Sequence, residues 1–375
     1  MDEHWYRTLA NAGIDGDILP QSTYTSLLTD SKVELLSLID AAYTVRKHFH
    51  GKTVTVHIIN NVSNGLCSED CNYCPQSRSS TAEIVEYSEK SDEEILLEAK
   101  QAYEAGAYRY CMVYAGRRSS KKRTESIANL VRTIKAQYPI EVCVSAGIMD
   151  ENSTRLLKQA GLDRLNHNLN TSSSQYTKIC TTHTFSDRLN TLKAARNSGL
   201  EVCSGIIAGM GETAEELVEL AVMLRDLEAK SIPINFLLPI VGNKLEIAQN
   251  LTPEYCLRIL CLFRFINPQA EIRTAAGREY HLRSMEVMSL YPANSLFMDG
   301  YLNTRGKSRQ DTLKMIIDAG FTIKSDKSAE ELLLQEGEET GGDGSTAPDL
   351  KSDTDLHPAS PHFSQRALNK AVHMV

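Results

Sequence analysis

The stretch RYCMVYAGRRSSKKRTESIANLVRTIKAQYPIEVCVSA (residues 109–146) contains a strand, a helix and a second strand in order. RYCMVYA (109–115) and IEVCVSA (140–146) are short apolar runs with the β-branched and aromatic residues that favour strands. Between them, ESIANLVRTIKAQY (125–138) repeats apolar residues at the spacing of an amphipathic helix. This order predicts a βαβ unit with parallel strands.

The same alternation continues along most of the chain. The predicted strands are residues 53–59, 109–115, 140–146, 163–169, 201–208, 232–239, 271–277 and 295–299. Helical patterns lie between them, and several end in glycine, as helices often do. Eight such strands predict an α/β fold of the (βα)8 TIM-barrel type, with an open doubly wound sheet as the alternative. A barrel of this type carries its chemistry at the carboxyl ends of its strands.

Two further regions flank the predicted barrel, which we assign to residues 51–324. Residues 1–50 are predicted to form a helical leader that packs on the barrel, with VELLSLIDAAYTVRKHF (33–49) as its clearest amphipathic stretch. Residues 325–375 are rich in Glu, Asp, Gly, Ser and Thr. Such a composition buries little apolar surface, so we expect an acidic, disordered tail.

Composition limits the class of protein. The chain has 375 residues, of which 42% are hydrophobic, enough for a substantial core. No apolar run is long enough to cross a membrane, and the first residues, MDEHWYRTLANAG, lack the features of a secretion signal, so we expect a cytoplasmic protein. The net charge of −8 equals that of residues 326–356, which hold ten acidic residues and two lysines. The remainder of the chain is balanced in charge and has no basic stripe, which argues against nucleic acid as a partner.

The first group of cysteines lies in NGLCSEDCNYCPQS (64–77), directly after the first predicted strand. Cys67, Cys71 and Cys74 have CxxxCxxC spacing, which allows a loop to fold three thiolates around one [4Fe–4S] cluster. Three protein ligands leave one iron open to the amino and carboxylate groups of S-adenosylmethionine (SAM). This pattern predicts a radical SAM enzyme. The alternatives are a zinc knuckle, although its usual paired spacing is absent, or three incidental thiols.

A second group of cysteines is spread over three predicted strands. Cys111, Cys143 and Cys203 occupy similar heights in these strands, so their thiols are expected to converge inside the barrel. A single strand cysteine is more often a small buried apolar residue, but three at matched heights favour a second cluster. Arg278 in AAGRE (275–279) is expected to point to the same axis, and chemistry alone makes it a counter-charge. The remaining cysteines, Cys180, Cys256 and Cys261, receive no predicted role.

Polar residues at strand ends suit a small neutral substrate. Carboxamides donate and accept hydrogen bonds without adding charge, although asparagine also caps strands and turns. His183 and Arg188 in TTHTFSDRLNT (181–191) are candidates for the methionine carboxylate of SAM, or else residues of an exposed helix face. The strand-end candidates are Asn166, His167, Asn168, Asn170 and Asn235.

Over roughly residues 30–323 the chain resembles the biotin synthase family. The motif CSEDCNYCPQS resembles the cluster loop of that family, and RYCMV, EVCVS and EVCSG resemble its three further cysteine strands. AAGRE resembles its arginine strand, and NHNLNTS, TTHTFSDRLNT, GMGET, PINFL and ANSLFMDGYLNTRG follow in the same order. The acidic tail has no counterpart in this pattern.

The resemblance implies a specific chemistry. It implies that Cys67, Cys71 and Cys74 hold a [4Fe–4S] cluster. It further implies that Cys111, Cys143, Cys203 and Arg278 hold an auxiliary [2Fe–2S] cluster, which makes Arg278 a ligand and not only a counter-charge. The family converts dethiobiotin to biotin with sulfur from the auxiliary cluster, and cleaves two SAM molecules to 5′-deoxyadenosine and methionine.

The resemblance also implies binding residues and partners. Asn168, Asn170 and Asn235 are expected near dethiobiotin and SAM. The implied partners are a flavodoxin- or ferredoxin-like electron donor and a second copy of the chain in a homodimer.

Two other functions remain open from the sequence. The first is a radical SAM paralogue that acts on another small substrate, although the presence of all the auxiliary ligands disfavours it. The second is a non-catalytic iron–sulfur or zinc protein whose tail recruits a partner. Metal content and cleavage of SAM distinguish these alternatives.

Overall fold

The structure, a computed structural model, describes residues 1–341, with side chains through residue 335. The chain divides into two units, Met1–Leu333 and Leu334–Val375. Of the second unit, the structure describes only the carboxyl-terminal part of helix α13 (Ala329–Gly341). The predicted disorder of residues 342–375 therefore falls outside the described residues.

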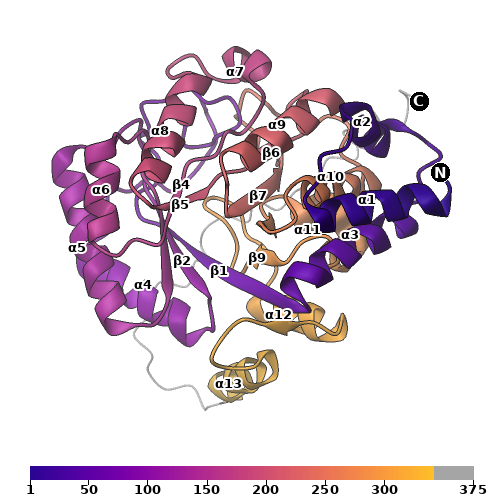
Figure 1. Cartoon of the computed structure of the whole chain (residues 1–375). Helices are drawn as coiled ribbons and strands as arrows, with labels where there is room; N and C mark the ends of the chain where they lie inside the picture. The colour runs from indigo at the N-terminus through magenta and orange to yellow at the C-terminus, as the bar shows by residue number, and fades with distance from the viewer. Residues whose placement is uncertain (342–375) are drawn as a thin grey trace. The chain divides into compact units, whose positions relative to one another are not determined.

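The strands of the first unit close into a parallel barrel (Figure 1). Around the barrel the order is β1, β2, β3, β4, β5 with β6, β7, β8 and β9, and β9 pairs with β1 to complete the circle. This arrangement confirms the predicted (βα)8 barrel and excludes the open doubly wound sheet. The strands are β1 (Thr53–Asn61), β2 (Arg109–Val113), β3 (Glu141–Ser145), β4 (Arg164–Asn166), β5 (Glu201–Cys203), β6 (Ile206–Ala208), β7 (Ser231–Phe236), β8 (Glu271–Thr274), β9 (Ser295–Phe297) and β10 (Thr322–Ile323).

One predicted strand, residues 201–208, is divided into β5 and β6. The break lies at Gly205, whose position beside β7 leaves no room for a side chain: a Cβ there would lie 1.8 Å from the carbonyl oxygen of Pro233. β5 pairs with β7 only through Cys203 and Ser231, and β6 continues the pairing at Ile206. The close backbone approach at Gly205 therefore explains why one apolar run forms two short strands.

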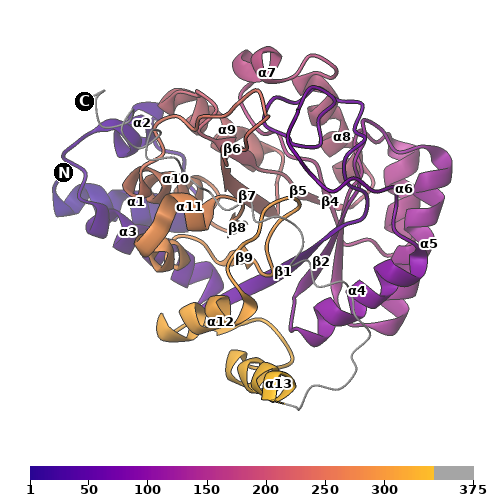
Figure 2. The same cartoon turned by 180° about the vertical axis from the view of Figure 1, so that it is seen from behind.

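Helices surround the barrel, as Figures 1 and 2 show from opposite sides. Several of them start at capping boxes, in which the first side chain and a Glu or Asp three residues later satisfy backbone N–H groups. Ser91, Thr184 and Thr213 begin α4, α8 and α9 in this way. The helices that follow the strands are α4 (Asp92–Glu104), α5 (Lys121–Gln137), α6 (Glu151–Gln159), α7 (Ser173–Ile179), α8 (Phe185–Asn197), α9 (Ala214–Asp226), α10 (Pro253–Ile266), α11 (Arg278–Leu282) and α12 (Arg309–Asp318), with a 3₁₀ helix at Arg283–Leu290.

The predicted helical leader is confirmed as α1 (Glu3–Asp15), α2 (Gln21–Thr29) and α3 (Leu35–His50). These helices pack against α9 and α10 on the outside of the barrel. Arg258 of α10 holds the connection between α2 and α3, because its guanidinium donates to the carbonyl oxygens of Leu27 at 3.1 Å and Val33 at 2.9 Å. Buried backbone oxygens of the leader thus gain charge-assisted hydrogen bonds.

Helix α13 lies within residues 325–375, the stretch predicted to form the acidic tail. α13 begins at Ala329, and both Ala329 and Leu332 are buried in an apolar cluster with Leu313 and Ile316 of α12. The stretch is rich in Glu, but it also contains a short amphipathic pattern. Ala329 and Leu332 are three residues apart and therefore share one face of the helix.

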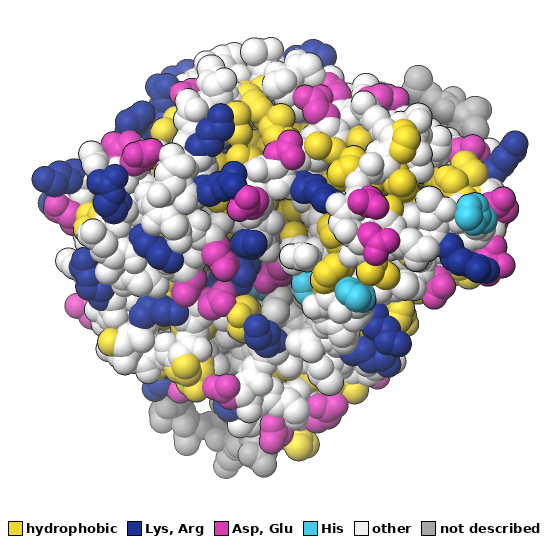
Figure 3. Space-filling model, in the orientation of Figure 1, with side chains coloured by type: hydrophobic (Ala, Val, Ile, Leu, Met, Phe, Trp, Pro, Cys, Tyr) yellow, Lys and Arg dark blue, Asp and Glu magenta, His cyan; other side chains and the backbone are white. Residues whose placement is uncertain are grey.

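Within the described part of the chain, no helix combines the length and the apolar character needed to cross a membrane. On the face drawn in Figure 3, lysine and arginine side chains are interspersed with aspartate and glutamate.

Candidate active site

The cysteine motif lies in the long loop between β1 and α4. The loop folds back on itself, because the N–H of Cys74 donates to the carbonyl of Cys71 at 3.2 Å and the N–H of Ser77 donates to that of Cys74 at 3.1 Å. Cys71 is buried, whereas Cys67 and Cys74 are partly exposed. Burial is the main factor that raises the pKa of Cys74 to about 11, so a metal ion must displace the proton when it binds.

A second segment, residues 179–183, packs on this loop. The carboxylate of Asp70 accepts a hydrogen bond from the N–H of Thr181 at 2.9 Å. The carboxylate of Glu69 lies 2.5 Å from Nδ1 of His183. These contacts fix the cysteine loop at the carboxyl end of the barrel, where a barrel of this type carries its active site.

Cys180 lies beside the cysteine motif, although the sequence assigned it no role. Its Sγ is 3.8 Å from Sγ of Cys71 and 3.3 Å from Nδ1 of His183. These three side chains lie close enough together to share a metal ion. No spacing in the sequence connects Cys180 with the cysteine loop, so only the fold reveals this neighbour.

The three strand cysteines meet inside the barrel, as the sequence predicts. Cys111 and Cys143 are directly paired across β2 and β3. The thiol of Cys143 contacts the thiols of both Cys111 and Cys203, and all three side chains are buried with Ala275 and Phe297. Three buried thiols gathered around Cys143 form a donor set that suits iron, zinc or copper(I), and the enclosed position suits a cluster more than an exchangeable ion.

The expected position of Arg278 is corrected by the structure. Gly277, with a φ of 84°, turns the chain out of β8, and Arg278 begins α11. Its Nε donates to Glu286 at 3.0 Å, its Nη1 donates to the carbonyl of Phe297 at 2.7 Å, and its Nη2 pairs with Glu279 at 3.1 Å. These structural bonds occupy all three nitrogens, so Arg278 does not face the thiols.

The arginine that lies with the strand thiols is Arg273 of β8. A hydrogen bond from Cys143 and the charge of Arg273 hold the pKa of Cys203 well below its usual value, against the effect of burial. Arg273 and Ala275 are two residues apart and therefore point to the same side of the strand. Alternation along EIRTAAG was the signal in the sequence that distinguishes Arg273 from Arg278.

One cavity of about 340 Å³ connects the two groups of cysteines. Cys74 lines it at the loop, whereas Cys111, Cys143 and Cys203 line it inside the barrel together with Arg273. Its volume is within the range of pockets that hold small molecules. A molecule in this cavity lies between the two groups of thiols.

The predicted asparagines line this cavity and are themselves held in place. The side-chain oxygen of Asn168 accepts from the N–H of Gly205 at 3.1 Å, and the amide of Asn235 donates to the carbonyl of Ile206 at 2.9 Å. The amide of Asn170 donates to the hydroxyl of Tyr73 at 2.5 Å. Strand-end capping and cavity lining are therefore combined in the same residues. The candidates of this group that line the cavity are Asn166, His167, Asn168, Asn170 and Asn235.

Arg188 also lines the cavity, and its guanidinium contacts the ring of His183. Nη1 of Arg188 donates to the carbonyl of Asn168 at 2.8 Å, and Nη2 lies 2.9 Å from Nε2 of His183. Its Nε contacts the hydroxyl of Tyr176. This partly buried cation is positioned to meet an anionic group in the cavity.

Comparisons with known proteins agree with this geometry. Residues 61–224 match the Radical SAM superfamily, and residues 233–322 match the Biotin and Thiamin Synthesis associated domain. A parallel barrel whose three-cysteine loop opens onto a central cavity belongs to the radical SAM class of enzymes. Within that class, the chain belongs to the biotin synthase family.

Curated relatives support the assignment to the family. The biotin synthase of Magnetococcus marinus is 56% identical over 316 residues, which cover 84% of this chain and 98% of the relative. That of Acaryochloris marina is 54% identical over 312 residues, which cover 83% of this chain and 90% of the relative.

Solved structures support the fold. A crystal structure of methylornithine synthase matches with a TM-score of 0.73 at 22% identity and covers 86% of this chain and 98% of its own. The FeFe-hydrogenase maturase of Carboxydothermus hydrogenoformans matches with a TM-score of 0.73 at 18% identity and covers 88% of this chain and 81% of its own.

Proposed function

We propose that this protein converts dethiobiotin to biotin, as a radical SAM sulfurtransferase with two iron–sulfur clusters. The observation that carries the proposal is a cavity that Cys74 lines at the cysteine loop and that Cys111, Cys143 and Cys203 line inside the barrel. Membership of the biotin synthase family gives the substrate. A paralogue that does not insert sulfur has no need of thiols inside the barrel. The presence of three buried thiols there therefore favours sulfur insertion.

The two groups of thiols fit two different clusters. Cys67, Cys71 and Cys74 would hold the [4Fe–4S] cluster in a loop that is partly open, which leaves room for SAM at the remaining iron. Cys111, Cys143 and Cys203, with Arg273 beside them, would hold the enclosed [2Fe–2S] cluster. When bound, the first cluster supplies the electron that cleaves SAM and the second supplies the sulfur atom.

The protein side chains between the clusters bind and orient. Arg188, held by Asn168 and His183, would meet the carboxylate of SAM. Asn168 and Asn235 would bind the neutral ring of dethiobiotin, because carboxamides match a urea group without adding charge. Asn170 would contact SAM, since it is bonded to Tyr73 of the cysteine loop.

The cavity wall has a protective function in this proposal. A radical reacts with what it touches, so the substrate must be held in one orientation and kept away from water. The apolar side chains of Ile59, Ile207 and Phe297 line the cavity and fit this requirement.

The expected partners belong to the same proposal. A reduced flavodoxin- or ferredoxin-like protein would supply electrons, and a second copy of the chain would complete a homodimer. A cytoplasmic location follows from the same assignment.

The test is an anaerobic assay of the reconstituted protein with SAM, a strong reductant and dethiobiotin, in which deoxyadenosine and biotin are both quantified. Two hydrogen abstractions predict about two deoxyadenosines per biotin. Deoxyadenosine without biotin would contradict the substrate and favour a paralogue. Neither product from protein that carries both clusters would contradict the radical mechanism itself.

A further inference from the structure

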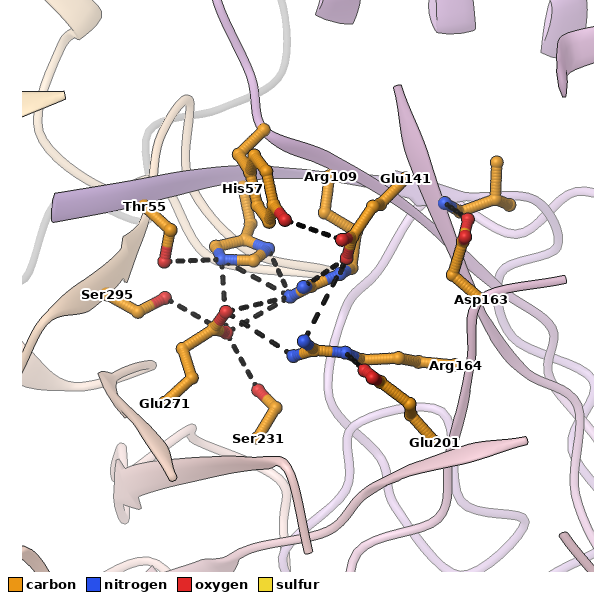
Figure 4. Close-up of polar contacts among 12 residues, drawn as sticks. Thr55, His57, Arg109, Glu141, Asp163, Arg164, Glu201, Ser231, Glu271 and Ser295 are labelled. Atoms are coloured by element: carbon orange, nitrogen blue, oxygen red, sulfur yellow. Dashed lines mark hydrogen bonds and ion pairs between the residues drawn. The ribbon is translucent and has the colours of Figure 1, made fainter. Parts of the chain in front are cut away.

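A layer of charged side chains crosses the barrel interior beneath the strand cysteines. Its members come from strands all around the barrel, and Figure 4 shows how the carboxylate of Glu271 faces His57, Arg109 and Arg164. Three arginines and three glutamates balance one another in this layer. The six charged residues are Arg109, Arg164, Arg273, Glu141, Glu201 and Glu271.

Glu271 is the centre of the layer. It is 7% exposed, and its Oε1 lies 3.0 Å from Nη1 of Arg109 and 3.2 Å from Nε2 of His57. Its Oε2 lies 3.4 Å from Nη1 of Arg164. Glu141 pairs with Arg109 and Arg164, and Glu201 pairs with Arg164. Glu271 contacts all three arginines of the layer, Arg273 included.

The contacts between Glu271 and Arg273 are direct and indirect. Nη2 of Arg273 donates to the Glu271 carboxylate and, at 2.8 Å, to the hydroxyl of Ser231. Nε of Arg273 donates at 3.1 Å to the hydroxyl of Ser295. Both serine hydroxyls donate in turn to Oε1 of Glu271, at 2.8 Å for Ser231 and 3.3 Å for Ser295.

These bonds leave one part of the Arg273 guanidinium unused. Nη1 has no hydrogen-bond partner among the described residues, whereas Nε and Nη2 are both engaged. The guanidinium also stacks on the ring of Phe297, with Cζ 4.8 Å from the ring centroid. Its plane and its direction are therefore fixed before any cluster binds, and the free nitrogen belongs to a side chain that lines the cavity with the thiols.

We propose that Glu271 is a positioning residue that orients Arg273 toward the auxiliary cluster. The proposal rests on the proposed function for the presence of that cluster, but the contacts that carry it belong to the protein alone. Glu271 connects with the cluster site through Arg273, through the two serines and through His57, whose Nδ1 lies 3.4 Å from Nη2 of Arg273. Partners of this kind set the orientation and the electronic character of metal ligands.

The charge of Glu271 gives the proposal a measurable consequence. Arg109 and Arg164 bring two further positive charges beneath the cluster site, and Glu271 contacts both. With a neutral residue at position 271, Arg273 loses its anionic partner and the site gains net positive charge. Because positive charge favours the reduced form of a cluster, its midpoint potential should rise.

The experiment compares Glu271→Gln with Glu201→Gln in reconstituted protein. Gln keeps the shape of Glu at both positions and removes one negative charge from the same layer. Glu201 pairs with Arg164 at 2.6 Å and belongs to the outer part of the layer, with a side chain that is 47% exposed. It is therefore a matched control that leaves Arg273 untouched.

The readouts are iron content, visible circular dichroism and the midpoint potential of the auxiliary cluster. We expect Glu271→Gln to change the dichroism bands and raise the potential at normal iron content, and to lower the biotin yield by ~10-fold or more. Deoxyadenosine formation should stay within about twofold of the parent protein, since the loop cluster is separate. Glu201→Gln should match the parent in every readout.

Identical bands and an identical potential in loaded Glu271→Gln and in the parent would overturn the proposal. If Glu271→Gln does not fold, Ser295→Ala tests the proposal in its place. It removes one hydrogen-bonded link between Glu271 and Arg273 and changes the side-chain volume little. This variant should shift the same bands by a smaller amount, and an unchanged spectrum would contradict the role of the layer. Failure of the parent protein to make biotin would contradict the proposed function alone, since the spectra still report on Glu271.

Discussion

The loop and the barrel each hold three cysteine thiols, but they assemble them differently. Cys67, Cys71 and Cys74 belong to one folded loop, and two of them are partly exposed. Cys111, Cys143 and Cys203 come from three strands and are all buried. An exposed site accepts a second molecule, whereas an enclosed site holds its contents away from solvent. The difference suits a cluster that must bind SAM and a cluster that must keep its sulfur for one substrate.

The largest expected effect comes from the loop. Cys71→Ala removes a proposed ligand of the [4Fe–4S] cluster. It should lower deoxyadenosine formation by more than ~100-fold, since the loss of even an outer-sphere partner of a metal ligand costs 10–100-fold. Biotin formation should disappear with it. The measurement is deoxyadenosine per protein under anaerobic conditions, and undiminished production would refute the assignment of the loop.

The matching change in the barrel should separate the two functions. Cys143→Ala removes a proposed ligand of the auxiliary cluster, so biotin formation should be lost. Cleavage of SAM should stay within about threefold of the parent, because distant sites act independently. The measurement is the amount of deoxyadenosine and of biotin formed in the same reaction. Normal biotin yield would show that the strand thiols do not supply the sulfur.

Arg273 and Arg278 are expected to respond differently to substitution, because only Arg273 lines the cavity with the strand thiols. Arg273→Ala should alter the visible spectrum of the auxiliary cluster and lower the biotin yield by ~10-fold or more. Arg278→Ala should leave that spectrum unchanged. It should instead reduce the free energy of unfolding by ~3–5 kcal/mol, because Glu286 loses a buried partner.

Absorption spectra and urea unfolding of the two variants distinguish these outcomes. A spectral change in Arg278→Ala with none in Arg273→Ala would restore the ligand role that the resemblance implied for Arg278.

The barrel could be predicted because each strand is a short apolar run between helical patterns. Such local patterns determine which segments form strands and which form helices. The cysteine loop could be predicted because its thiols are adjacent in the sequence. Arg273 was missed because alternation separates it from Arg278 but does not say which side of β8 faces the thiols. The burial of Ala275 with the thiols identifies that side. Cys180 was missed because α7 and the loop after it are brought to Cys71 by tertiary packing alone.

A smaller effect is expected at the cavity wall between the two groups of thiols. Burial, with the nearby charges of Arg188 and His183, holds the pKa of His167 well below its usual value. The imidazole is therefore neutral in the folded protein, whereas the unfolded chain binds a proton below about pH 6.5. Since the unfolded state takes up the proton, the stability that is present above about pH 6.5 is lost as the pH falls.

His167→Asn should remove this contribution. In cluster-free protein, the slope of unfolding free energy against pH should decrease by up to ~1.4 kcal/mol per pH unit between about pH 6.5 and 5. Urea unfolding at several pH values measures it. The same slope in both proteins would mean that His167 is protonated in the folded state.

Mössbauer spectroscopy of the reconstituted protein tests the central claim, that the two groups of thiols hold two different clusters. We expect two populations of iron in a ratio of about 4:2, from one [4Fe–4S] and one [2Fe–2S] cluster. The smaller population should vanish in Cys143→Ala and the larger one in Cys71→Ala. A single population, or loss of the same population in both variants, would contradict the account.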